Sequence, residues 1–272
     1  MGLASRKLSR TKQLDDGVVG VRTSRYTKLV ASGPIAAVTG QVIRGLRITG
    51  TSGIAINIGP NVHDVLIEDC EIGPMNLGGT AGNGIQIESG AYNITIWHCT
   101  IHGVFSGLYA VGAKHPIVFE ANYVYDILSP MPHGQMAQFN NVNGGTGQSK
   151  IIRNISDANA RTQTTHYEDH ISMYESSGTA ATPILIACNR IRGGDSQSGS
   201  GLMIGDWGTS LASAGHYYDV RYNIVVDVPN TGIGVPGGGD PFPHISTIDM
   251  KTAQVISDVS YLPRQDNTGG KT

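Results

Sequence analysis

A short apolar segment with β-strand character recurs along the chain. Val65–Ile72 reads VLIEDCEI, and Ile94–Ile101 reads ITIWHCTI. Aliphatic residues alternate with other residues in these segments, which is the period of a β-strand, whereas the 3.6-residue period of a helix is absent. A marker residue stands near the end of each segment, and it is Cys or Asn in every segment but the first. The markers are Leu46, Cys70, Cys99, Asn122, Asn154, Asn189 and Asn223.

The spacing of these markers varies between 23 and 35 residues while the local motif stays the same. A constant motif with insertions of different length is typical of a solenoid, in which each repeat is one coil. A second alternating segment follows each marker, as at Gly84–Glu88 and Ala137–Asn140. We therefore expect an all-β, single-domain right-handed parallel β-helix (a β-solenoid) of about seven coils with a dry interior.

The Asn and Cys markers have a physical explanation in such a fold. An inward Asn can satisfy backbone groups that a tight turn leaves unpaired, and Asn side chains on successive coils can bond one another at a spacing of about 4.8 Å. This Asn/Cys turn ladder resembles that of the pectate-lyase-like superfamily of right-handed parallel β-helices. Cys70 and Cys99 would be neighbours in the ladder, where a disulfide is conceivable.

The resemblance covers roughly residues 35–245 and implies the fold and a preference for carbohydrate. No catalytic residue carries over from it. The paired Asp and Gly-His-Gly of polygalacturonases are missing, and so is the Arg-x-Pro-x-x-Arg of pectate lyases.

The two ends of the chain lie outside the repeat. We expect an N-terminal cap or attachment segment at 1–34, the β-helix at 35–245, and a C-terminal cap with a flexible tail at 246–272, because open solenoid ends expose strand edges. The first residues contain no apolar run of the signal-peptide type, and no apolar stretch is long enough for a membrane span. The expected location is the cytoplasm, a virion, or outside the cell by another export route.

The charge balance argues against a nucleic-acid partner, and the cysteine spacing argues against a metal site. The formal net charge is −2 and charged residues make up only 15%, so there is no electrostatic basis for binding nucleic acid. The three cysteines have no metal-type spacing. We expect a polysaccharide or other glycan as partner and no membrane, and an oligomer is compatible with the pattern.

The long insertions flank the second strand of the later coils, which predicts a cleft over that sheet in the C-terminal half. Amides, hydroxyls and aromatic rings that face outward there suit sugar recognition, although they can also be ordinary solvated positions. Gln86 is one of the residues expected to face outward on this sheet. The predicted substrate-binding residues are Glu88, Tyr109, Gln138, Asn140, Ser172, Arg192 and Trp207.

The densest group of ionisable residues is the segment HYEDHISMYE at 166–175. Asp169, Glu175 and Asp206 can serve as the carboxylic acids of a glycosidase or as calcium ligands. His170 or Tyr174 can serve as the base of a lyase. The pair His166 and His170 invites a zinc site, but that spacing shares one face only on a helix, so we predict no metal site there. The alternative is a polar loop without a catalytic role.

Two functional hypotheses follow from the sequence. The first is a carbohydrate-active β-helix that binds a polysaccharide, with cleavage by a lyase or glycoside hydrolase mechanism left open. The second is a non-catalytic phage tail, virion or surface-adhesin component, which fits the missing signal peptide and the non-repeating N-terminus.

Overall fold

The computed structural model describes residues 19–25, 28–75, 80–128, 134–160, 167–196, 199–205, 215–228, 230–234, 245–248 and 254–256. These residues form β-strands and turns, with no helix among them. The strands pair in parallel within three large sheets, which confirms the all-β, parallel character expected from the sequence. The arrangement is compatible with a parallel β-helix.

We name the three sheets A, B and C. Sheet A comprises β1 (Val30–Ser32), β4 (Leu46–Ile48), β8 (Glu71–Ile72), β12 (Thr100–Val104), β15 (Tyr123–Ile127), β18 (Ile155–Asp157), β21 (Arg190–Arg192), β24 (Ile224–Val226) and β27 (Gln254–Ile256). Sheet B comprises β2 (Ile35–Ala37), β6 (Ile56–Ile58), β10 (Ile85–Ile87), β13 (Leu108–Val111), β16 (Ala137–Asn140), β19 (Ile171–Tyr174), β22 (Ser200–Ile204) and β25 (Thr231–Gly234). Sheet C comprises β3 (Val42–Arg44), β7 (His63–Glu68), β11 (Tyr92–Trp97), β14 (Ile117–Glu120), β17 (Lys150–Ile152), β20 (Ile184–Ala187), β23 (Tyr218–Arg221) and β26 (Ile245–Ile248).

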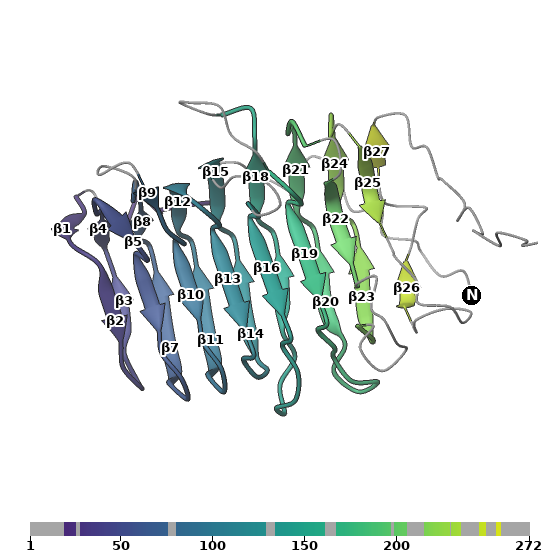
Figure 1. Cartoon of the computed structure of the whole chain (residues 1–272), viewed down its shortest axis with the longest axis horizontal. Helices are drawn as coiled ribbons and strands as arrows, with labels where there is room; N and C mark the ends of the chain where they lie inside the picture. Colours follow the sequence, from purple (N-terminus) through teal and green to yellow (C-terminus); the bar gives the residue numbers. More distant parts are fainter. Residues whose placement is uncertain are drawn as a thin grey trace, which may run out of the picture.

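The chain visits the sheets in the order A, B, C and then returns to A, one strand further along. Strands of successive passes therefore lie side by side from β1 at one end of the molecule to β27 at the other (Figure 1). A small additional pair, β5 (Ser52–Gly53) with β9 (Thr80–Ala81), joins two of the connections between sheets A and B.

Alternation within each strand explains where the core lies. In sheet B, Ile85 and Ile87 face inward and are fully buried, whereas Gln86 between them is only partly buried. Phe119 of sheet C and Phe139 of sheet B are among the largest buried side chains. Because parallel strands stack in register, like residues lie above like residues, and the interior is filled by columns of aliphatic side chains.

The turn from sheet C to sheet A carries the marker residues and has the same backbone in pass after pass. Asn154 Nδ2 donates to Asn189 Oδ1 at 3.0 Å, and Asn189 Nδ2 donates to Asn223 Oδ1 at 2.9 Å. The Oδ1 of Asn189 also accepts the backbone N–H of Asn154 at 3.0 Å. The residue before each marker adopts a left-handed conformation with φ between 51° and 66°. These residues are Gly45, Asp69, His98, Ala121, Arg153, Cys188 and Tyr222.

The cysteines are free thiols, and Cys70 and Cys99 are buried in the same turn position. Burial raises the pKa of the Cys99 thiol, and the hydrogen bond that Cys99 donates to Cys70 acts in the same direction, whereas this bond lowers the pKa of Cys70. Both thiols serve as small packing groups in the turn.

The segment 19–25 does not continue the strand pattern and packs along the C-to-A turns. Gly20 N donates to Ala121 O at 2.9 Å. Arg22 Nη2 lies 2.5 Å from Asp69 Oδ2, and its guanidinium lies 4.4 Å from the centre of the Trp97 ring. Burial opposes ionisation of Asp69, but the hydrogen bonds from Arg22 outweigh it and lower the pKa of that carboxyl. Arg22 thus anchors the segment 19–25 to these turns, because it neutralises the buried carboxylate of Asp69.

Candidate functional site

The outer face of sheet B presents two columns of side chains in register. Gln86 lies beside Asn57 and Tyr109, and Gln138 lies between Tyr109 and Ser172. Two residues further along each strand, Val111, Asn140 and Tyr174 form the second column, which Glu88 extends. Amides and hydroxyls dominate both columns because the strand period places every second residue on this face.

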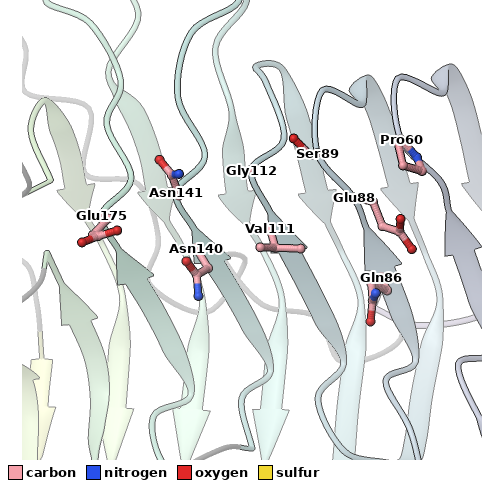
Figure 2. A pocket seen from close by; sticks show the side chains of 9 residues that line it. All are labelled: Pro60, Gln86, Glu88, Ser89, Val111, Gly112, Asn140, Asn141 and Glu175. Carbon is pink, nitrogen blue, oxygen red and sulfur yellow. The ribbon is translucent and has the colours of Figure 1, made fainter.

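A hollow of about 560 Å³ lies over the ends of five neighbouring strands of this sheet, from β6 to β19. Figure 2 shows Glu175 at one end of the hollow and Pro60 at the other, with Glu88 next to Pro60 and Val111 and Asn140 between the two carboxylates. The hollow is open to solvent, so it is a groove along the stack of strands. Its lining residues are Pro60, Gln86, Glu88, Ser89, Val111, Gly112, Asn140, Asn141 and Glu175.

The floor of the groove depends on left-handed residues that follow β13, β16 and β19. Gly112, Asn141 and Glu175 occupy equivalent positions, with φ of 61°, 54° and 47°. Gly and Asn adopt this conformation readily, whereas a Glu there stores roughly 1 kcal/mol of strain. Asn143 Nδ2 donates to Glu175 O at 3.0 Å and holds the strained turn. The same left-handed backbone occurs outside the groove, as at His98 and Arg153, so Glu175 is a candidate for binding because it lines the groove.

Glu88 and Glu175 are the carboxylates of the groove. They follow β10 and β19, which are three strand spacings apart, so their backbones are separated by about 14 Å. The two carboxylates therefore belong to different strands along the groove, and this placement suits contacts at two points of an extended ligand.

The cluster predicted at 169–175 is divided between the two ends of β19. Asp169 and His170 precede the strand and are buried, whereas Tyr174 is 40% exposed at its far end beside Glu175. Asp206, the fifth predicted catalytic residue, lies outside the described residues. The structure thus places only Tyr174 and Glu175 of this cluster at the groove.

Asp169 is a buried carboxyl with a structural contact. Its Oδ1 accepts the backbone N–H of Ser200 at 2.7 Å. Burial raises the pKa of Asp169 to about 7, and the neighbouring Glu168 carboxylate acts in the same direction. Asp169 therefore titrates near neutrality, but it precedes β19 and does not line the groove.

His170 is also buried, and both of its ring nitrogens have partners. Nδ1 lies 2.6 Å from Ser156 Oγ, and Nε2 lies 3.1 Å from Gly193 O. The ring stacks on Tyr167 with 4.3 Å between the ring centres. Burial lowers the pKa of His170 to about 4, so the neutral ring accepts from Ser156 and donates to Gly193. In this state the ring links two passes of the chain.

The predicted substrate-binding residues fall on two different faces. Glu88 and Asn140 line the groove, and Asn140 Nδ2 donates to the hydroxyl of Tyr109 at 3.3 Å. Gln138 and Ser172 lie in the adjoining column, although Ser172 is largely covered. Arg192 lies in sheet A, where it pairs with Asp157, and Trp207 lies outside the described residues.

Sequence reasoning missed the part of the groove that is built from turns. Pro60, Ser89, Val111, Gly112 and Asn141 follow or end strands of sheet B, one position beyond the polar alternation. The alternation could have indicated them if each strand had been extended by one or two residues. The groove also extends from β6 to β19, further toward the N-terminus than the cleft predicted in the C-terminal half.

Among the described residues, no group of three or more His, Cys, Asp or Glu side chains could hold a metal ion. In the part of the chain that the structure describes, no helix is long and apolar enough to cross a bilayer. No protein-family model, curated protein or solved structure matches the chain.

Proposed function

We propose that this protein is a right-handed parallel β-helix of about seven coils, similar to the pectate-lyase-like superfamily, that binds a polysaccharide in the groove over sheet B. The observation that carries the proposal is the groove itself, which runs across five strands and is lined mainly by amides, hydroxyls and carboxylates. Such groups exchange hydrogen bonds with sugar hydroxyls. The hydrogen bonds among Asn122, Asn154, Asn189 and Asn223 support the turn ladder on which the fold assignment rests.

Binding without cleavage is the version that the geometry supports best. The two groove carboxylates belong to strands three spacings apart, with backbones about 14 Å from each other, which suits contacts at two points of an extended ligand. Asp169 and His170 are buried, hold hydrogen bonds within the protein and do not line the groove. The same observations favour a non-catalytic surface component, such as a virion or adhesin β-helix that recognises glycans, over a lyase or hydrolase.

A glycan panel tests this proposal. Neutral, acidic and amino-substituted oligosaccharides should be titrated into the protein by isothermal calorimetry, and each mixture should be examined for new reducing ends and unsaturated products. We expect at least one class to bind without conversion to products. Tyr109→Ala should weaken this binding, whereas Thr95→Ala on the outer face of sheet C should leave it unchanged.

Two results would count against the proposal in different ways. Absence of binding by every class would remove the glycan function. Cleavage that is lost in Glu175→Gln or Asp169→Asn would restore the catalytic hypothesis and contradict the proposal of binding without cleavage.

A further inference from the structure

The groove over sheet B has an unbalanced charge. Its lining includes the carboxylates of Glu88 and Glu175 and no Lys, Arg or His. Among the described residues, neither carboxylate forms an ion pair with a cationic side chain, in contrast to Glu68 and Glu71, which pair with Arg44 and Arg47.

The columns beside the groove do not supply a positive charge either. Asn57, Gln86, Tyr109 and Gln138 are neutral polar residues, and the described outward positions of β6, β10, β13, β16 and β19 contain no Lys or Arg. A ligand that carries carboxylates or sulfates would meet like charge at Glu88 and again at Glu175. Clefts of one sign concentrate ligands of the opposite sign.

The two carboxylates also have a defined separation along the groove. Each strand spacing advances about 4.8 Å, which is similar to the length of one hexopyranose unit in an extended chain. Glu88 and Glu175, three strand spacings apart, would therefore meet sugars that are three residues apart. A ligand must contain at least four sugar units to contact both.

We propose that the groove selects a cationic glycan, one whose sugars bear protonated amines, and that Glu88 and Glu175 each bind one ammonium group. The inference rests on the proposed glycan-binding function and specifies its substrate class. The amide of Asn140 and the hydroxyl of Ser89, which also line the groove, bind the hydroxyls of the other sugars.

The test compares three oligosaccharides of matched length that differ in charge. Oligomers of β-1,4-linked glucosamine are cationic, their N-acetylated forms are neutral, and oligogalacturonate is anionic. Calorimetry at pH 6 should show the glucosamine tetramer binding about tenfold more tightly than the acetylated tetramer, with no measurable binding of oligogalacturonate. The preference should decrease when salt is raised, because screening shortens the reach of exposed charges.

Variants assign the preference to the two carboxylates. Glu88→Gln and Glu175→Gln should each weaken binding of the glucosamine tetramer by about tenfold and that of the acetylated tetramer by a much smaller factor, so that the preference between the two ligands falls. Glu71→Gln, which removes a carboxylate from the outer face of sheet A, is the matched control and should change neither affinity. The trimer should bind more weakly than the tetramer, and Glu175→Gln should abolish most of that difference.

The outcomes separate this inference from the proposed function. Binding of acidic or acetylated oligomers as tight as that of the amino oligomers would overturn the charge selectivity and leave a glycan groove in place. Equal affinities of wild type and both Gln variants for the glucosamine tetramer would also overturn it. Failure of all three oligosaccharides to bind would overturn both.

Discussion

Replacing Asp169 with Asn should change how the free energy of unfolding depends on pH. Burial raises the pKa of Asp169 to about 7 in the folded protein, against an ordinary value of 3.8. Below pH 3.8 the carboxyl is protonated in both states, and its stabilising effect is complete. Between pH 3.8 and 7 the unfolded chain releases the proton while the folded chain keeps it, so stability falls as pH rises. About three pKa units correspond to a loss of about 4 kcal/mol by pH 7.

The neighbouring His170 has the opposite effect. Burial lowers the pKa of His170 from 6.5 to about 4. Its contribution to stability is complete above pH 6.5 and is lost as pH falls toward 4, by about 3 kcal/mol. In the wild type the two slopes largely cancel between pH 4 and 6.5. Asp169→Asn keeps an oxygen that can accept the Ser200 N–H but does not titrate, so the variant should gain stability with rising pH through this range.

Urea unfolding followed by circular dichroism, at half-unit steps from pH 3.5 to 8, measures both curves. Relative to wild type, Asp169→Asn should gain about 4 kcal/mol between pH 4 and 7. Asp227→Asn, on the exposed turn after β24, is measured alongside to correct for the loss of one carboxyl. Curves of wild type and Asp169→Asn that stay parallel across this range would refute the reasoning.

Three further substitutions test other parts of the structure. Arg22→Ala leaves the buried carboxylate of Asp69 without its main partner and should cost about 3 kcal/mol in urea unfolding, more at pH 7 than at pH 3. Asn154→Ala removes the side-chain hydrogen bonds to both neighbouring passes and should lower stability by about 3 kcal/mol, while a serine at this position should recover part of the loss. Glu175→Gly relieves the left-handed strain and should raise stability by about 1 kcal/mol while weakening glycan binding. A stabilising Arg22→Ala, a neutral Asn154→Ala or a destabilising Glu175→Gly would each contradict the corresponding argument.

The alternation of aliphatic and other residues was enough to predict parallel β-structure without helices. It succeeded because most described strands of the three sheets have one buried face, as the alternation of buried Ile85 and Ile87 with partly buried Gln86 shows. The marker residues could be found for a similar reason, since Asn is rarely buried without a backbone group to satisfy.

Other features depend on contacts that are distant in the sequence. Nothing in the residue types of His98, Cys188 or Tyr222 indicates a left-handed backbone, which the turn from sheet C to sheet A imposes. The pairing of Arg22 with Asp69 joins residues 47 positions apart and has no local signal. The density of ionisable groups at 166–175 did not indicate where the groove lies, because the residues before β19 are buried whereas those at its far end are exposed.

The claim that the groove over sheet B binds a glycan is tested most directly by filling the groove. Val111 lines its centre, and Val118 occupies an outward position of sheet C. Calorimetric titration of the tightest-binding oligosaccharide should show the same affinity for wild type and Val118→Trp and no measurable binding to Val111→Trp. Undiminished binding by a folded Val111→Trp protein would contradict the account.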